Sequence, residues 1–415
     1  MHACVIGAGV VGVTTAYRLA AEGHRVTLVD ARARPAEVAS YANGGQLSYS
    51  YVAPLAGPGV LPNVPGWLLR EDSPLRFTPR LDPHQWLWGL RFVAACNTAT
   101  STRTTAQMLT LSYLSRDTLH ALLEREKLSF GHRKNGKLIV YRTPALLDKA
   151  RKLVEYQARH GASQEVLDRR QTLEREPALA GLGDRLAGAV YTPGEEAGDC
   201  HAFTCELFAR LQAMPGATVR MGARVDALVR QAGRIVAART SQGDIEADAF
   251  VVAAGLGSRE LLRPLGVSLP LYGLKGYSLS VPVAGQAAGT PAISVTDYER
   301  RIVYARVGDV LRIAAMVDMG ARDDKVDPRR IALLKRQVRE AFPQLDLDAA
   351  SQWAGLRPAT PGGKPIIGAS RAAGNLWLNV GHGALGFTLA CGSAALLAAQ
   401  MEGRTPPIDP APFLP

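Results

Sequence analysis

Three glycines near the start of the sequence have the spacing of a tight turn between a strand and a helix. The segment Gly7-Ala8-Gly9-Val10-Val11-Gly12 follows the apolar run 3–6, and residues 13–22 have a helical pattern that Gly23 closes. In such a turn the first glycine allows the sharp bend, the second lets a pyrophosphate approach the backbone, and the third lets the helix pack closely on the strand. The helix would direct free N–H groups and the positive end of its dipole towards the phosphates.

A carboxylate follows the turn at the place where the same fold needs one. Residues 25–29 have the pattern of a second strand, and Asp30 stands at its end. A carboxylate there accepts hydrogen bonds from the two ribose hydroxyls of an adenosine and repels a 2′-phosphate, which disfavours NADP. FAD and NAD both remain at this point. The strand, helix, second strand and acid in this order favour a nucleotide-binding domain over a chance glycine turn.

Two later segments could approach a bound ring system. Residues 39–58 are rich in Ser, Tyr, Asn and Gly, and the backbone amides of Asn43-Gly44-Gly45-Gln46 could lie against a planar group. An ordinary surface loop explains the same composition equally well. Residues 250–254 read as a buried strand that ends in Gly255-Leu256-Gly257-Ser258, which resembles a second loop on the nucleotide side. A plain strand-to-helix connection is the alternative.

The elements that must position these residues alternate between helix and strand patterns. Helices are expected at 83–96, 105–125, 146–160 and 329–341, and strands at 137–141, 277–282, 302–307 and 310–317, with short strands around hairpin turns over 217–245. We therefore expect an α/β plus α+β protein, with a Rossmann-like domain interleaved with a smaller sheet-based, substrate-binding domain. The expected boundaries are 1–90, 195–268 and 350–415 for the first domain, and 91–194 and 269–349 for the second.

Composition narrows the class of protein. The 415 residues are 47% hydrophobic and 20% charged, which is typical of a globular protein with two domains. The net charge of +11 could attract nucleic acid, anionic membranes or anionic small molecules, but the basic residues are spread widely and form no tail, which disfavours nucleic acid. The five cysteines favour structural thiols in a reducing compartment. Cys200 and His201 have no second pair at ligand spacing, so we expect no metal.

Some apolar segments could be taken for export or membrane signals. Residues 1–21 lack a basic start and carry periodic glycines, which favours a folded strand and helix. Residues 384–401 have no charge over about one membrane-spanning length, but polar residues and glycines dilute them, so we expect a buried helix. Trp86 and Trp88 could contact a membrane or a quinone, although packing in the core is the favoured interpretation.

The C-terminal part of the chain carries the motifs of a known family. GLRPATP begins at Gly355, GKPIIG at Gly363, and NLWLNVGHGALGFT at Asn375. Together with GAGVVGVTTAY, SYANGGQLS, GDCHAFT and LKGYSLSVP earlier in the chain, these motifs occur in order between Val5 and about Arg404. The sequence resembles the D-amino acid oxidase and glycine oxidase superfamily of flavoproteins, and within it the bacterial D-amino acid dehydrogenases.

This resemblance implies a set of site residues. Residues 381–388 would open the final helix against the pyrimidine end of a flavin, with His382 as a flavin neighbour or structural residue rather than a base. Arg357 would anchor the substrate carboxylate, with Tyr277 and Lys275 beside it. Further candidates for the pocket are Tyr49, Tyr51, Tyr298 and Tyr304. The expected FAD-binding residues are Gly7, Gly9, Val10, Val11, Gly12, Asp30, Ala31, Ser40, Asn43, Gly44, Gly45, Gln46, Val225, Ala254, Gly255, Gly381, His382, Gly383, Leu385, Gly386 and Thr388.

The resemblance also implies an activity. We expect noncovalent FAD, because TPGGKPIIG contains no cysteine where some relatives attach the flavin, and oxidative deamination of small D-amino acids such as D-alanine to 2-oxo acids and ammonia. Hydride would pass from the α-carbon to flavin N5, and electrons would then pass to a quinone or another respiratory carrier. This acceptor suggests a cytoplasmic protein with a peripheral contact on the inner face of the plasma membrane.

Several alternatives stay open. D-hydroxyproline, D-proline, glycine or sarcosine could replace the D-amino acid, particularly because Gly44-Gly45 and the run SYSY from Ser48 depart from the usual dehydrogenase pattern. An oxidase that uses oxygen is the main rival to the dehydrogenase. A different class of function is also possible, in which the chain is a non-catalytic flavoprotein subunit of a heteromer. A plain NAD dehydrogenase is disfavoured by the glycine-rich C-terminal helix.

Overall fold

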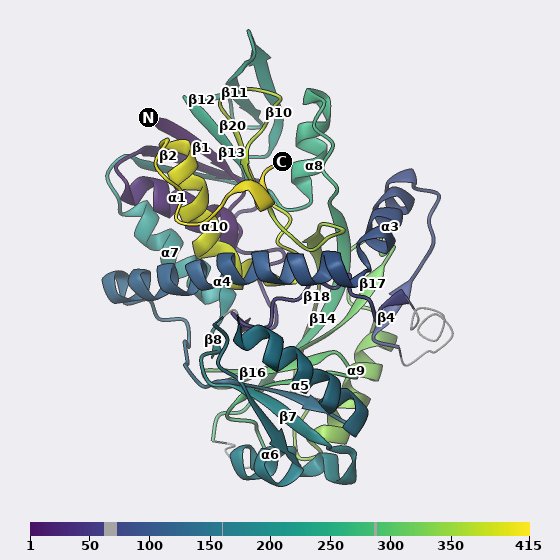
Figure 1. The fold of residues 1–415 in the computed structure, drawn as a ribbon. Helices are drawn as coiled ribbons and strands as arrows, with labels where there is room; N and C mark the ends of the chain where they lie inside the picture. Colours follow the sequence, from purple (N-terminus) through teal and green to yellow (C-terminus); the bar gives the residue numbers. More distant parts are fainter. Residues whose placement is uncertain (62–72, 160, 286–288) are drawn as a thin grey trace.

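A mainly parallel sheet carries the N-terminal glycine turn. The computed structural model describes residues 1–61, 73–159, 161–285 and 289–415 (Figure 1). Within them β1 (His2–Ile6) pairs in parallel with β2 (Arg25–Asp30) and with β13 (Ala249–Val252). The sheet continues to β9 (Ala217–Met221) on one side, and to β20 (Leu376–Val380) and the antiparallel edge strand β19 (Ile366–Ala369) on the other. Its central strands are continuously apolar because both faces are covered.

Helices cover this sheet. Helix α1 (Val10–Ala21) packs against α7 (Cys200–Gln212) and α10 (Gly386–Met401), and α4 (Thr98–Glu126) packs against α10. Residues 387–399 of α10 are all buried, as the sequence predicted. By length and composition Gly383–Met401 could cross a membrane, but 72% of that window is buried inside the protein, which is typical of a core helix. In Figure 1, α4 runs between the parallel sheet above and a larger sheet below.

Within the described parts of the chain, the larger sheet has nine strands and is mostly antiparallel. Tyr277, Leu279, Ile313 and Ala315 from its strands form one core with α9 (Pro328–Ala341) on one face. On the other face Ser278 Oγ donates a hydrogen bond to the Ala42 carbonyl at 2.7 Å, so this face meets the nucleotide domain. The strand order is β18 (Ser351–Ala359), β14 (Tyr272–Pro282), β17 (Val310–Met319), β16 (Ile302–Val307), β15 (Ser294–Asp297), β5 (Lys137–Tyr141), β7 (Gly188–Thr192) and β6 (Glu165–Asp168), with β4 (Leu75–Phe77) beside β17.

Shorter elements complete the two domains. They are β3 (Gln46–Leu47) paired with β8 (Glu196–Ala197), the small sheet of β10 (Val225–Gln231), β11 (Arg234–Thr240) and β12 (Ile245–Glu246), and helices α3 (Pro83–Ala95), α5 (Pro144–Ala158), α6 (Arg169–Arg175) and α8 (Gly257–Leu262). The expected Rossmann-like domain interleaved with a sheet-based domain is confirmed.

The domain boundaries differ from the expected ones at two places. Strand β18, expected in the nucleotide domain because it lies beyond residue 350, pairs with β14 at the edge of the larger sheet. Strand β4, from the expected 1–90 segment, pairs with β17 of the same sheet. Strand β4 has only three residues, and β18 contains a glycine and a proline, so their own sequences carry little strand signal.

Candidate active site

The N-terminal turn is shaped so that only glycine fits at two of its positions. Gly7 has φ +111°, and a Cβ there would lie 2.5 Å from the Ala253 carbonyl oxygen. A Cβ on Gly12 would overlap the carbonyl oxygen of Gly7. These contacts bring the glycine turn against the 253–255 segment and fix the start of α1 on β1. Ala254 and Gly255 therefore lie beside the glycine turn, after the carboxyl end of β13.

Gly9 is different, because the protein alone does not require glycine there. Its φ is −74°, and an added Cβ would make only an ordinary contact with Ser40 Oγ, at 3.5 Å. It is the N-cap of α1 but offers no side-chain cap, and the first turn holds no acidic residue. A helix start without a capping side chain of its own leaves backbone amides for an approaching pyrophosphate. Val10 and Val11 form that first turn, in which Val10 N already donates to Ser40 Oγ at 3.1 Å.

Asp30 is oriented by the backbone beside this turn. Its Oδ2 accepts from Ala8 N at 2.6 Å and its Oδ1 from Arg32 N at 2.7 Å. Each carboxylate oxygen has a second lone pair, so the ribose hydroxyls of an adenosine can still be bound. The Asp30 carbonyl accepts from Ala223 N at 2.9 Å, which places the start of β10, and with it Val225, near the same end. Ala31 is exposed next to Asp30.

The C-terminal glycine segment lies against the same end of the sheet. Asn379 Nδ2 donates to Thr15 Oγ1 of α1 at 3.0 Å, so the end of β20 is tied to the helix that follows the first turn. Gly381 has φ +84° and Gly383 has φ +56°, and a Cβ on Gly381 would lie 2.7 Å from Thr360 Cγ2. The backbone thus requires these glycines, and Gly383, Leu385 and Gly386 form the turn that enters α10.

His382 is buried inside this segment. Burial lowers its pKa to about 3, and its Nε2 pairs with Ser393 Oγ at 2.9 Å. The imidazole is therefore neutral and engaged within the protein. This placement agrees with a structural neighbour of the cofactor rather than a base that takes a proton from substrate.

The segment from Ser40 to Gln46 links the two glycine turns to the larger sheet. Gln46 Nε2 donates to the carbonyl of Val295 and to that of Tyr304, both at 3.1 Å. Gly45 has φ +65° and packs on Ala305, while the Asn43 carbonyl accepts from Arg312 Nη1 at 3.2 Å. Farther along, Ser48 N donates to Thr388 Oγ1 at 3.3 Å. The loop is thus held between the domains, and the alternative of an ordinary surface loop is wrong.

Arg357 lies on the face of the larger sheet that meets the nucleotide domain. Gly355 lies two residues before Arg357 on β18, so both are on the same face of the sheet. Gly355 is paired with Gly276, and a Cβ on Gly276 would overlap the Arg357 guanidinium. Its Nη1 donates a hydrogen bond to the Met316 carbonyl at 2.9 Å, and this is the one hydrogen bond that the side chain makes with the described residues. Burial lowers the pKa of Arg357 to about 10, with Asp318 opposing the shift, so it stays cationic at neutral pH. Most of its five donors are left for a ligand.

Tyr277 and Lys275 are not brought to Arg357. They alternate along β14 with Leu274 and Gly276, so their side chains lie on the opposite face of the sheet. The Tyr277 hydroxyl donates to Asp318 Oδ2 at 3.0 Å, and Lys275 Nζ contacts Asp323 Oδ1 at 3.4 Å. A direct part in the same pocket therefore finds no support in this arrangement, because an odd spacing along a strand separates side chains onto two faces.

The other candidate tyrosines divide into two groups. Tyr49 is buried with its hydroxyl on Glu196 Oε2 at 3.2 Å, and Tyr304 is buried against Phe342 on the α9 face. Tyr51 and Tyr298 are partly exposed and belong to one cluster, in which Lys137 Nζ lies 4.4 Å from the centre of the Tyr51 ring. Tyr51 and Tyr298 thus keep some exposed surface, whereas Tyr49 and Tyr304 are buried within the protein.

Some site residues escaped sequence reasoning. Gly276 lies within the quoted motif LKGYS, and its pairing with Gly355 of GLRP was a usable signal, because an arginine that lies flat on a sheet needs glycine beneath it. Lys137, buried with its Nζ on Ser48 Oγ at 2.8 Å, had no signal beyond an unusual charge at the start of an apolar strand. Met316 had none, because its importance lies in its carbonyl.

The comparisons with known proteins identify the class. The FAD dependent oxidoreductase family matches residues 2–400, and the chain belongs to this family. The glycine turn, Asp30, the segment from Ser40 to Gln46 and the start of α10 are suited to bind FAD, the cofactor of this family. The protein is thus an FAD-dependent oxidoreductase, and the predicted cofactor, enzyme class and family are confirmed.

Individual relatives narrow this further. The chain is 52% identical to D-amino acid dehydrogenase 2 of Ralstonia nicotianae, with 100% of this chain and 99% of the relative covered. It is 50% identical to D-amino acid dehydrogenase 2 of Pseudomonas aeruginosa, with 99% and 97% covered. The fold is also that of glycine oxidase from Geobacillus kaustophilus, with a TM-score of 0.78 at 22% identity over 100% of this chain and 97% of that one.

Proposed function

We propose that this protein catalyses the oxidative deamination of small D-amino acids of the D-alanine type to 2-oxo acids and ammonia. The observation that carries the proposal is the Arg357 guanidinium, which faces the nucleotide domain with most of its donors unused. A planar guanidinium binds a carboxylate through two parallel hydrogen bonds. Full-length relatives named D-amino acid dehydrogenase support the D-amino acid class.

The residues of the chain contribute mainly by positioning. FAD, when bound, supplies the acceptor for the hydride that leaves the α-carbon. Arg357 holds the carboxylate and so fixes the α-carbon relative to the strand that carries it. An isolated bridge pairs Ala359, two residues farther along β18, with His382 of the glycine segment, so the anchor and the start of α10 share one backbone framework. His382 stays neutral and moves no proton.

Substitution of Arg357 tests the anchor. Arg357→Ala is expected to raise the KM for D-alanine at least a hundredfold, because charge-assisted hydrogen bonds to the carboxylate are lost, each worth roughly 1.5–3 kcal/mol. Arg357→Lys keeps the charge but not the planar guanidinium, so its KM for D-alanine is expected to lie between that of the wild type and that of Arg357→Ala. FAD content should be unchanged in both. An unchanged KM in Arg357→Ala would remove the anchor and with it the proposed substrate class.

We further propose that the electron acceptor is a membrane quinone and that α3 contacts the cytoplasmic face of an anionic membrane. Trp88 packs in the core, as the sequence predicted, but Trp86 is 50% exposed. It shares the surface of α3 with Leu87, Leu90 and Val93, all exposed, and Leu81 just before the helix is fully exposed. The net charge of +11 favours anionic lipid.

This surface also lies near the site. Trp88 Nε1 donates to the Ala359 carbonyl at 3.0 Å, so α3 contacts the strand that carries Arg357. An apolar face with a tryptophan at its edge suits the boundary between lipid headgroups and acyl chains. A lipid-soluble acceptor that enters along α3 would thus arrive close to the bound cofactor.

Vesicle binding and acceptor assays test these two parts. The protein is expected to sediment with phosphatidylglycerol vesicles, and Trp86→Ser with Leu90→Asp should abolish this without lowering dye-linked D-alanine oxidation. Leu153→Asp, on the exposed part of α5, is the matched control and should change neither. Equal sedimentation of the double variant would exclude the α3 contact. Release of peroxide in place of quinone reduction would assign an oxidase.

A further inference from the structure

Strand β17 contains a bulge directly beneath Arg357. On one side of it Lys275 pairs with Asp318, and on the other Tyr277 pairs with Ala315, so Met316 and Val317 together face the single residue Gly276. Met316 has φ +69°, in the left-handed region that non-glycine residues rarely adopt. It is also buried. A left-handed residue of this kind persists only where its surroundings hold it.

The bulge determines where one carbonyl points. The Met316 carbonyl accepts from Arg357 Nη1 at 2.9 Å, and the guanidinium lies flat over Gly276, where no side chain competes for the space. In regular strand geometry this carbonyl would take part in the ladder with β14. The orientation of the guanidinium thus depends on the conformation of Met316.

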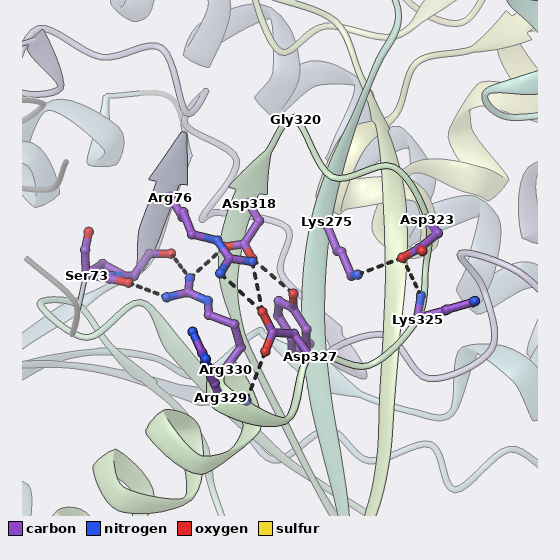
Figure 2. Close-up of polar contacts among 12 residues, drawn as sticks. Ser73, Arg76, Lys275, Asp318, Gly320, Asp323, Lys325, Asp327, Arg329 and Arg330 are labelled. Carbon is purple, nitrogen blue, oxygen red and sulfur yellow. Dashed lines mark hydrogen bonds and ion pairs between the residues drawn. The ribbon is translucent and has the colours of Figure 1, made fainter. Parts of the chain in front are cut away.

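A buried carboxylate follows the bulge on β17, on the face of the sheet opposite Arg357. Figure 2 shows this carboxylate, Asp318, with Arg76 and Arg330 beside it. Asp318 is 2% exposed, and its Oδ2 accepts from the Tyr277 hydroxyl at 3.0 Å and from Arg76 Nη2 at 2.6 Å. Its Oδ1 forms an ion pair with Arg330 Nη2 at 2.7 Å. Asp318 is thereby fixed from β14, β4 and α9, and its charge also reaches Arg357, whose pKa it raises against the larger effect of burial.

The backbone of the bulge is held as well. Val317 N donates to the Pro74 carbonyl at 2.8 Å, and Arg330 Nη1 donates to the neighbouring Ser73 carbonyl at 2.9 Å. Strand β4 continues this pairing, with Arg76 opposite Asp318. The main chain and the side chain directly after Met316 are therefore anchored to β4 and α9.

We propose that Tyr277, Arg76 and Arg330 are positioning residues that act through Asp318 to lock the β17 bulge and so orient the Arg357 guanidinium for a carboxylate. The proposal rests on the proposed role of Arg357. It gives Tyr277 a function that needs no contact with substrate. Affinity for the carboxylate should follow the state of the bulge, while cofactor binding should not.

Removal of one hydroxyl tests this. Tyr277→Phe keeps the ring in its core but deletes the donor to Asp318, and it is expected to raise the KM for D-alanine about tenfold with kcat changed less than about twofold. The Kd for propionate, followed by flavin absorbance, should rise by the same factor, whereas the Kd for ethylamine, which lacks the carboxylate, should not change. Tyr17→Phe, which loses a hydroxyl bound to Glu126 on α4, is the matched control and should change none of these values.

A rescue separates positioning from general loss of structure. Glycine adopts positive φ without strain, so adding Met316→Gly to Tyr277→Phe is expected to recover most of the propionate affinity. Arg76→Met, at a half-exposed position, gives a second measurement if Tyr277→Phe folds poorly. Unchanged propionate affinity in both variants, or equal weakening of propionate, ethylamine and FAD, would overturn the inference. If Arg357→Ala also leaves propionate affinity unchanged, the proposed function fails with it; if only Arg357→Ala weakens it, the inference alone fails.

Discussion

At the scale of single residues, the three glycines of the first turn have different duties. Gly7 and Gly12 are required by contacts within the protein, whereas Gly9 has room for a methyl group and an ordinary φ of −74°. The sequence motif treats the three as one fingerprint. The structure separates residues that build the turn from the one residue that leaves space for the ligand.

Gly9→Ala is therefore expected to leave the melting temperature of the FAD-free protein within about 2 °C of wild type while weakening FAD binding at least tenfold, because its methyl group occupies the approach of the pyrophosphate. Gly12→Ala should damage both folding and FAD binding. Gly23→Ala, with φ +87° and no atom within 4 Å of the added Cβ, should cost about 1 kcal/mol of stability and keep its flavin. FAD titration with thermal unfolding measures all three, and a stable Gly9→Ala with normal FAD affinity would contradict the division of duties.

Glu196, which lies on β8 opposite Leu47 of β3, makes a pH-dependent contribution to the stability of the protein. Burial would raise its pKa, but hydrogen bonds from His132 and His120 outweigh burial and hold the pKa below its ordinary value of 4.5. A depressed carboxyl pKa contributes stability above the unfolded pKa, and this contribution is lost as pH falls through the folded pKa. Glu196→Gln is thus expected to cost about 1–3 kcal/mol at pH 7, and progressively less as pH falls from 4.5 through the lowered folded pKa. Denaturant unfolding at pH 7 and over a series of pH values below 4.5 measures this, and a cost that does not change with pH would contradict it.

Residue-scale prediction from sequence succeeded where a motif specifies the backbone, as at Gly7 to Gly12 and Gly381 to Gly386. The motif GLRP also singled out Arg357, whose role as the carboxylate anchor stays a prediction. Residue-scale prediction failed to place Tyr277 and Lys275, because nearness along a strand does not tell which face a side chain occupies. The bulge at Met316 adds a further shift that no local pattern reveals.

At the scale of elements, strand β5 is tied to the loop that follows β3. Lys137 is 2% exposed, and burial lowers its pKa to about 8 while Glu195 opposes the shift. Lys137 Nζ donates to Ser48 Oγ, and Glu195 Oε1 accepts from Ser50 N at 2.7 Å. Two buried groups of opposite charge thus hold the SYSY run, one through the Ser48 side chain and the other through the Ser50 backbone.

Lys137→Met is expected to destabilise the protein by about 3–5 kcal/mol, because it leaves the Glu195 carboxylate buried without its cation. The double variant Lys137→Met with Glu195→Gln should recover a large part of this loss. Denaturant unfolding of the two single variants and the double variant measures the coupling. Additive losses would show that the two groups act independently.

Elements with a strong local pattern were predicted closely. The strand expected at 302–307 is β16, the helix expected at 329–341 is α9, and the helix expected at 105–125 lies inside α4. Strand β18 was not foreseen, because Gly355 and Pro358 weaken its pattern and its place is set by pairing with β14. Pairing across the domains depends on contacts far apart in sequence.

At the scale of the whole molecule, the chain passes repeatedly between two domains, and both domains contact the segment from Ser40 to Gln46. Ser278 Oγ of the larger sheet donates a hydrogen bond to the Ala42 carbonyl, and Gln46 Nε2 donates hydrogen bonds to two carbonyls of the same sheet. FAD binding should therefore stabilise both domains together. Thermal unfolding is expected to show one transition, and its midpoint temperature should rise when FAD is added. At an FAD concentration a thousand times Kd, the free energy of unfolding should increase by about 4 kcal/mol. Calorimetry with and without FAD measures this, and two transitions of which only one responds would contradict it.

The bridge between Ala359 and His382 has a consequence for redesign of the enzyme. The strand that presents Arg357 is joined backbone to backbone to the segment that begins α10, so every accepted amino acid should enter with its α-carbon in one place. Libraries that seek new side-chain preferences should accordingly keep 355–361 and 381–386 constant and vary residues elsewhere. Stereochemical preference should survive such evolution even where chain length and polarity of the accepted substrate change.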